Sequence, residues 1–536
     1  MPLNVALWKN LPWSRSAFVV CWSLVAVLVA AYTIANGVVR PTMFSDSGWG
    51  LLGWDNRAGL PFNMSSGPDP GDISRDVSGF MTAWSPGQHL LPGWLEEAGL
   101  DLGWAMVLVA AAATIAGLLG WYVLYRAFGF PVRSSAIAVL IVACTRHVGL
   151  AFGIYNGGEV LLFGTAPWFL LVVWRLRDLR WSAVVPLLAA PLVLFLAKLS
   201  GIVLAAAAIG AVVPRPERGW LGVALARRAV VAGVTITAMG LVFYFAWFSR
   251  GWTAVSEQTT LQWPLLVSHG ALAVGAVWSS SLSLGELAAY LLVHPSRPVL
   301  GSVLPVYYLF LPLALATFVL MWWRLRRDFA DYLLFAALFA AAVSAVLVWT
   351  WARGSVVSSD ERHFRIVSLV LFGGMVHCFL ELPWRLPRLA FAAIAILACA
   401  YGAAAQASRL ADNARRPLGD RGFRHWIASA EALDFIRSVD RRGADRRATL
   451  IHVTSPEIGL EVRHSRVMAN HADFQSPDFL RTVKLHGRVP RLYVIVQKRL
   501  VDNGKADLML RSFVDYGAQS WRKIPLGDFV AFAAED

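Results

Sequence analysis

The chain alternates long apolar runs with short polar connections. Runs of roughly 20 apolar residues can cross a bilayer core of about 30 Å as helices. The pattern predicts eleven spanning segments, at about 17–38, 102–124, 134–152, 158–174, 182–197, 200–213, 229–248, 302–323, 329–349, 366–382 and 388–407. The fifth and sixth are short and flank Lys198-Leu199-Ser200-Gly201, so one long tilted helix is an alternative there.

The connections predict a topology. One set of loops, together with the N-terminus, holds about twice as many basic residues as the opposite set, so this side is expected to be cytoplasmic. An odd number of spans then places the tail, 408–536, outside with two long loops, 39–101 and 249–301. We expect the Pro- and Gly-rich centre of the first loop, 67–72, to be neither helix nor strand. In the second loop, 265–278 predicts a re-entrant or surface-lying helix.

The tail is charged and ordinary in composition. A helical pattern covers about 425–439, and strand-like runs follow at 448–454, 461–468, 491–497 and 529–532. The predicted fold is therefore a polytopic α-helical membrane domain, 1–407, with the N-terminus inside, followed by a C-terminal soluble α/β domain outside.

Composition agrees with this class and excludes others. Of the 536 residues 57% are hydrophobic and only 15% are charged, which is too few charges for a soluble chain of this length. The net charge of +14 lies in short loops, so it indicates topology signals and not a nucleic-acid interface. Four cysteines without a CxxC pair support neither a disulfide framework nor a zinc site. The Arg- and Ala-rich, Cys-poor composition favours a bacterial inner or plasma membrane protein.

The first loop carries the leading candidate for chemistry. Asp46 follows the first span within Phe44-Ser45-Asp46-Ser47-Gly48, and its carboxylate could deprotonate a hydroxyl or bind a divalent ion. Alternatively, Ser45, Asp46 and Ser47 cap a short surface helix. The segment Trp84-Ser85-Pro86-Gly87 predicts a rigid turn, and His89 just after it is more often structural than catalytic.

Charged residues near the membrane give further candidates. Glu159 begins the fourth span after two glycines, where it favours a helix N-terminus or binds a ligand. Lys198 lies in an apolar run and needs a partner, such as a phosphate or Glu159, unless it reaches the interface. At the start of the tenth span, Arg362, His363 and Arg365 suit either phosphate or lipid headgroups.

These motifs together resemble the GT-C superfamily of integral-membrane glycosyltransferases, which use polyprenyl-phosphate sugar donors. The matching features are Asp46 after the first span with the following Gly59-Leu60-Pro61, the segment Trp84-Ser85-Pro86-Gly87-Gln88-His89-Leu90-Leu91-Pro92, and the mouth Glu361-Arg362-His363-Phe364-Arg365. An outer soluble C-terminal domain is also common in that family. The chain departs from the pattern in its Pro/Gly/Asp-rich loop centre and in having no second acid beside Asp46, which leaves metal dependence open.

The resemblance implies a hexosyl or pentosyl transferase acting on a cell-envelope glycan, lipid or protein acceptor at the outer face. Asp46 would be the general base and Glu159 the second acid, holding the acceptor or a metal. The carrier phosphate would be bound by Arg362, Lys198, Arg365 and His363. The substrate pocket would include Trp49, Trp54, Trp84, His89 and Asp55. No cofactor is required by the sequence, although a divalent cation is compatible with it.

Two other function classes compete. A lipid or solute transporter or flippase would need no catalytic acid, and Arg146, His147 and Lys198 could line its path. A membrane acyltransferase or phosphotransferase would be favoured by a His-Asp pair. Asp46, Glu159 and Arg362 around one outward cavity would favour the glycosyltransferase.

Overall fold

The fold was analysed in a computed structural model, which describes residues 15–57, 59–60, 63–214, 223–251, 261–293, 299–354, 357–442, 448–470 and 475–535. Nine helices in these ranges are long and apolar enough to cross a membrane. They are α1 (Arg15–Val39), α4 (Leu102–Ala127), α7 (Gly157–Arg175), α10 (Val223–Ala246), α11 (Trp263–Ser279), α13 (Leu304–Leu325), α14 (Ala330–Ala352), α15 (Arg365–Leu380) and α16 (Arg385–Arg415). A tenth candidate is the pair α5 (Val132–Cys144) and α6 (Arg146–Gly153), bent by 43°. The chain is thus a polytopic helical membrane protein.

Every apolar run of the sequence coincides with a helix, but the runs are not all alike. The two short ones are separate helices, α8 (Val184–Ala197) and α9 (Gly201–Ala211), so the alternative of one long helix is wrong. α11 packs against α13, α14 and α15, so it is not a surface-lying helix. α16 continues beyond 407 to Arg415 as one helix. The number of spans and their orientation stay predictions.

The helices α4 and α7 belong to the buried part of the bundle, together with α11 and α15, whereas α1 lies at its periphery. Glycines allow α4 and α7 to approach closely: a Cβ on Gly117 would lie 2.4 Å from the Phe163 ring, and one on Gly164 would lie 2.7 Å from the backbone oxygen of Ala113. Such small residues at a helix interface are typical of packing in membranes.

Between α1 and α4 the first loop folds into four main elements. These are α2 (Ser45–Asp55), β2 (Met64–Asp69), β3 (Asp72–Phe80) and α3 (Gly87–Glu97). β2 and β3 pair as an antiparallel hairpin with an irregularity at Pro68/Asp69, so our expectation for 67–72 was wrong. A two-stranded hairpin tolerates Pro68 because β2 is an edge strand that pairs on one side only.

The tail forms a five-stranded sheet in the order β6-β5-β7-β9-β8. Strands β5 (Thr449–Val453), β6 (Arg466–Ala469) and β7 (Arg491–Gln497) are parallel, whereas β9 (Phe529–Glu535) is antiparallel to β7 and to β8 (Arg522–Leu526). Its helices are α17 (Ala430–Arg441), α18 (Pro456–Gly459), α19 (Pro477–Thr482), α20 (Lys498–Asp502) and α21 (Lys505–Ser512). The predicted run 461–468 is strand only at its end, and β8 was not predicted.

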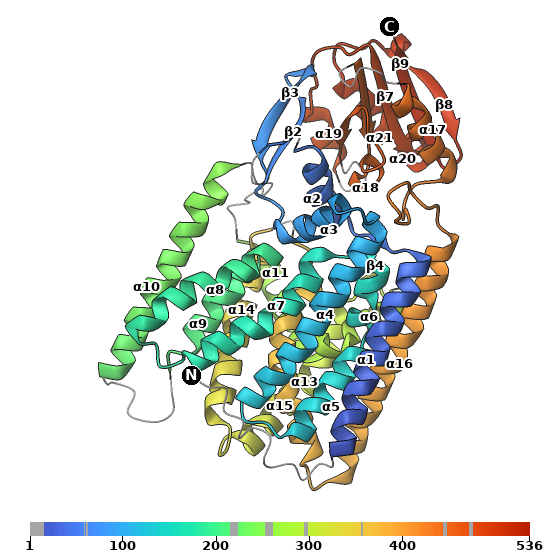
Figure 1. Cartoon of the computed structure of the whole chain (residues 1–536). Coiled ribbons are helices and arrows are strands. Elements are labelled where there is room, and N and C mark those ends of the chain that lie inside the picture. The colour runs from blue at the N-terminus through green and yellow to red at the C-terminus, as the bar shows by residue number, and fades with distance from the viewer. Residues whose placement is uncertain are drawn as a thin grey trace.

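The tail domain and the first loop meet at the same end of the bundle (Figure 1). The Arg466 side chain on β6 contacts Asp76 on β3 and donates to the Ile73 and Arg75 carbonyls. Arg424, before α17, donates its backbone N–H to the Pro41 carbonyl. In Figure 1, α2 and α3 lie between the sheet and the helices, so the tail rests on the elements that follow α1.

Candidate functional site

Asp46 lies in the first turn of α2, and backbone pairing fixes that turn. The short strands β1 (Thr42–Met43) and β4 (Ile154–Tyr155) are parallel neighbours, which joins the end of α1 to the start of α7. The Ser47 hydroxyl accepts a hydrogen bond of 2.9 Å from the Gly157 N–H. These contacts place Asp46 beside the N-terminus of α7.

Asp46 is half-buried and surrounded by charges. Burial raises the pKa of the Asp46 carboxyl above its usual value, Arg362 and Lys198 oppose the rise, and Glu159 adds to it. A carboxylate with a raised pKa is a stronger base than a carboxylate with the ordinary pKa. Asp46 therefore interacts electrostatically with Glu159, Lys198 and Arg362, the charged residues that the sequence indicated as candidates.

Glu159 and Lys198 are partners. Lys198 lies between α8 and α9 with an extended backbone conformation. Its ammonium forms an ion pair with the Glu159 carboxylate. Of the alternatives that the sequence left open for Lys198, the structure shows the pairing with Glu159. The Nε of Arg362 lies 3.8 Å from the same carboxylate, which holds two cations at the start of α7.

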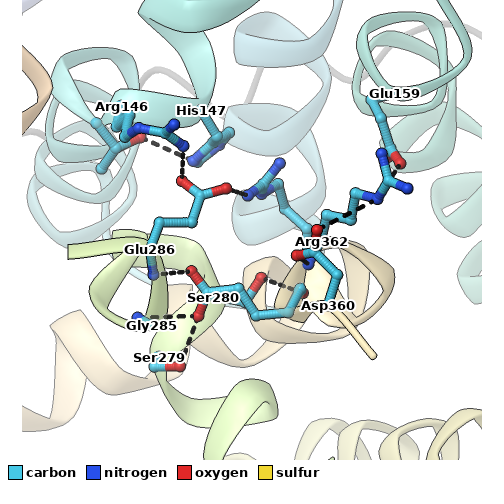
Figure 2. Close-up of polar contacts among 12 residues, drawn as sticks. Arg146, His147, Glu159, Ser279, Ser280, Gly285, Glu286, Asp360 and Arg362 are labelled. Atoms are coloured by element: carbon cyan, nitrogen blue, oxygen red, sulfur yellow. Dashed lines mark hydrogen bonds and ion pairs between the residues drawn. The ribbon is translucent and has the colours of Figure 1, made fainter. Parts of the chain in front are cut away.

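Arg362 is fixed by the short helix η5 (Glu361–Phe364), on which it lies. The Asp360 side chain accepts from the Arg362 N–H at 3.0 Å and lies 3.5 Å from its guanidinium (Figure 2). The guanidinium also donates to the Ser358 hydroxyl at 3.2 Å and lies 5.2 Å from the centre of the Phe44 ring. His363, next on η5, acts electrostatically on Glu159 and lies 3.5 Å from the Ser358 hydroxyl.

A second charged cluster surrounds Glu286, on α12 (Leu284–Leu292). Its carboxylate forms ion pairs with Arg146 and, at 3.0 Å, with Arg365 (Figure 2). Burial alone would raise the pKa of Glu286, but the two arginines lower it to about 2. Glu361 lies behind this cluster and accepts hydrogen bonds from the Ser279 hydroxyl and two backbone N–H groups.

Both clusters line one cavity of about 300 Å³. Its charged lining residues are Arg146, Glu159, Glu286, Asp360, Arg362, Arg365 and Arg409, and its other lining residues include Phe44, His147, Asn156 and Trp426. Four guanidiniums face three carboxylates there. Arginine binds phosphate and carboxylate groups with paired hydrogen bonds, so the cavity suits an anionic ligand.

Other predicted residues lie elsewhere. Asp55, at the far end of α2, forms an ion pair with the buried Arg421, and it lines a separate pocket together with Trp54. His89 is 1% exposed, and burial, aided by Arg57, lowers its pKa to about 3, so it is a neutral core residue. The half-buried Trp49 and Trp84 are not among the residues that line the cavity of Glu159.

The described residues contain no group of three or more His, Cys, Asp or Glu side chains that could hold a metal ion. Glu159 acts electrostatically on Asp46, and it is already paired with Lys198.

Sequence reasoning missed Glu286, Arg409 and Trp426. For Glu286 there was a signal, because it is a lone acid in the apolar run 284–292, and an acid in such a run needs a partner. Arg409 and Trp426 lie near the start of the charged tail, where single Arg and Trp residues are not distinctive.

Comparison with known proteins gives structural neighbours only. No protein-family model matches the chain, and no curated protein matches it by sequence. ArnT from Cupriavidus metallidurans is 13% identical with a TM-score of 0.49, covering 95% of this chain and 97% of its own. The arabinofuranosyltransferase AftD from Mycobacteria is 15% identical with a TM-score of 0.48, covering 96% of this chain and 40% of its own. The Archaeoglobus fulgidus oligosaccharyltransferase is 13% identical with a TM-score of 0.49, and the match covers 96% of this chain and 74% of the oligosaccharyltransferase. Likenesses at these values assign no activity to the chain.

Proposed function

We propose that the chain is a membrane glycosyltransferase of the GT-C type, which moves a sugar from a polyprenyl-phosphate carrier to a cell-envelope glycan, lipid or protein acceptor. The reaction takes place at the outer face of a bacterial plasma membrane, where the first loop and the tail domain lie. A hexosyl or pentosyl group is transferred.

One observation carries the proposal. Asp46, a half-buried acid with a raised pKa, lies within electrostatic reach of Arg362 and Lys198. Arg362 lines the cavity together with three other arginines, although Asp46 itself is not among the lining residues. A base for an acceptor hydroxyl and cations for a departing phosphate are thus close together. The motif resemblance around Asp46 and Arg362 supports the same conclusion independently of this geometry.

The reaction is a single displacement. Asp46 takes the proton of the acceptor hydroxyl as its oxygen attacks the anomeric carbon of the donor sugar. The bond between that carbon and the phosphate oxygen breaks, and the carrier phosphate leaves with the electron pair. Arg362 and Lys198 stabilise its charge, aided by His363. Attack opposite the leaving group inverts the anomeric centre.

The roles proposed for Glu159 and Arg365 differ in part from those that the family resemblance implies. Glu159 is the second acid, and its contacts support a positioning role because it binds both Lys198 and Arg362. Arg365 lines the cavity but is paired with Glu286, so it contributes to phosphate binding from within that cluster. A divalent cation at Asp46 stays compatible with the proposal.

The competing transporter needs a path across the membrane lined by Arg146 and Lys198. These two residues instead form ion pairs with Glu286 and Glu159 near the end of the bundle that carries the tail. No observation on the described residues favours transport over transfer.

The test is a transfer assay in sealed proteoliposomes with a panel of radiolabelled polyprenyl-phosphate sugars and a crude envelope extract. Asp46→Asn should abolish transfer, whereas Glu97→Gln, which removes an exposed acid paired with Arg57 in the same loop, should keep it. Wild-type turnover in Asp46→Asn would refute the role of Asp46. Equal movement of label across the bilayer in both proteins, without transfer, would refute the glycosyltransferase.

A further inference from the structure

Arg409 is the cavity arginine whose charge is least satisfied. Arg146 and Arg365 are paired with Glu286, and Arg362 lies against Glu159 and Asp360. Among the residues that the structure describes, both Nε and Nη1 of Arg409 are buried and have no hydrogen-bond partner, whereas Arg362 and Arg365 each have one such atom, Nε. Asp412, on the same helix, attracts it electrostatically. Buried donors without partners are rare in folded proteins, so each needs an explanation such as an absent ligand or water.

The structure holds this side chain in place. A Cβ on Gly153 would lie only 2.6 Å from Cγ of Arg409, so the glycine leaves the space that the arginine stem occupies. The guanidinium lies over the Trp426 ring, with its carbon 4.5 Å from the ring centre. Because Gly153 accommodates the aliphatic part of Arg409 and Trp426 packs on its guanidinium, the side chain is a preorganised hydrogen-bond donor and not a mobile surface group.

Trp426 connects the cavity with the tail domain. It lines the cavity of Arg409 and Arg362, and it also lines a second, open pocket of about 490 Å³ on the tail. That pocket is otherwise formed by Gln497, Lys498, Arg499, Asp502, Asp528 and neighbouring residues. Arg409, which lies against the Trp426 ring, is therefore on the side of the cavity that is nearest in sequence and contact to the tail pocket's Trp426.

We infer that Arg409 forms a second anion-binding subsite in this cavity, which takes a phosphate or carboxylate group of the substrate apart from the phosphate bound at Arg362. The inference rests on the proposed function for the identity of the ligand. The anion has two chemical sources: a second phosphate on the lipid carrier, or an acidic sugar of the acceptor entering past Trp426.

Binding to the full chain in nanodiscs, measured by calorimetry, tests the subsite without requiring turnover. The probes are farnesyl phosphate, farnesyl diphosphate and a trimer of galacturonic acid. Arg409→Gln should weaken an anionic probe by about ten- to a hundredfold, the usual effect of losing a hydrogen bond to a charged group. Gly153→Ala should reproduce the loss by displacing the arginine stem without removing its charge.

Arg416→Gln is the matched control, because Arg416 also lies over Trp426, at 5.0 Å, but does not line the cavity. It should leave binding unchanged. A loss in Arg409→Gln confined to the diphosphate identifies the carrier as the source, and a loss confined to the galacturonate identifies the acceptor. Unchanged affinity for every probe, or no binding of any probe to the wild type, overturns the inference.

The same variants separate this inference from the proposed function. If Asp46→Asn abolishes transfer but Arg409→Gln binds every probe normally, only the subsite is wrong. If no donor supports transfer but binding depends on Arg409, the subsite stands and the glycosyltransferase assignment fails.

Discussion

Replacing Arg421 by methionine removes the centre of a buried ion cluster. The Arg421 side chain is fully buried and lies in the segment after α16. It donates to Asp55 at the end of α2 and, from Nε at 2.9 Å, to Glu96 on α3. The substitution keeps an unbranched chain of similar bulk but leaves both carboxylates without this cation.

The expected loss of unfolding free energy is about 3 kcal/mol. Breaking a buried ion pair by removing one partner costs about 3–5 kcal/mol. The lower end applies because the Asp55 and Glu96 side chains keep 26% and 20% of their surface exposed. Burial already raises the pKa of Asp55 against the opposing effect of Arg421, so without Arg421 this pKa rises further. The deficit is therefore largest at alkaline pH and shrinks as falling pH protonates the carboxyls.

Thermal unfolding in nanodiscs, followed by tryptophan fluorescence at several pH values, measures this effect. The triple variant Arg421→Met/Asp55→Asn/Glu96→Gln should recover most of the loss, since no buried charge is then left unpaired and Arg463, which loses Glu96, is exposed to solvent. Arg481→Met is the control, because Arg481 forms an exposed ion pair, which contributes little. The reasoning fails if Arg421→Met melts like the control, or if the triple variant is as unstable as the single one.

Three further predictions concern the site and the bundle. The acid limb of the pH–rate profile should lie at a higher pH than an ordinary carboxyl would give. It should move to higher pH in Lys198→Met and to lower pH in Glu159→Gln, because Lys198 lowers and Glu159 raises the pKa of Asp46. Shifts in the same direction would exclude Asp46 as the titrating group. Glu286→Gln should lower stability above pH 4.5, with the difference from wild type vanishing toward pH 2 as the wild-type carboxyl is protonated, and melting curves across that range test it. Gly164→Val should destabilise the bundle by about 1–3 kcal/mol, because it forces α4 and α7 apart; an unchanged melting temperature would contradict the close packing.

The sequence was most informative where a single physical cost dominates. Apolar runs located the helices because a spanning segment has few alternatives in a bilayer. The pairing of Lys198 with Glu159 was predictable for a related reason, since an isolated charge at membrane depth requires a partner. In the tail, β7 was located to the residue because 491–497 is a run of strand-forming residues buried on both faces.

The sequence was least informative where the structure depends on distant partners. The hairpin at 67–72 was missed because Gly and Pro weaken a strand locally, whereas cross-strand pairing and the contact of Arg466 with Asp76, 390 residues apart, decide the outcome. Glu286 is marked locally as a lone acid in an apolar run, but its partners Arg146 and Arg365 lie 140 and 79 residues away, so the sequence does not show which cations it meets. Asp55 and His89 share the first loop with Asp46, but Asp55 lies at the other end of α2 and His89 is buried on α3, and neither lines the cavity.

The position of Asp46 depends on residues from several parts of the chain. At the start of α2, the Ser47 hydroxyl accepts from Gly157, and at its end Asp55 is held by Arg421. Between these points α18 packs on the helix so closely that a Cβ on Gly48 would lie 3.2 Å from Pro456. The tail domain thus contacts the middle and the end of the helix that carries the proposed base. Because a base must lie within hydrogen-bonding reach of the proton it takes, the tail is better regarded as part of the frame of the site than as an appended module. Removing it should therefore impair transfer even though Asp46, Glu159 and Arg362 all lie in the membrane domain.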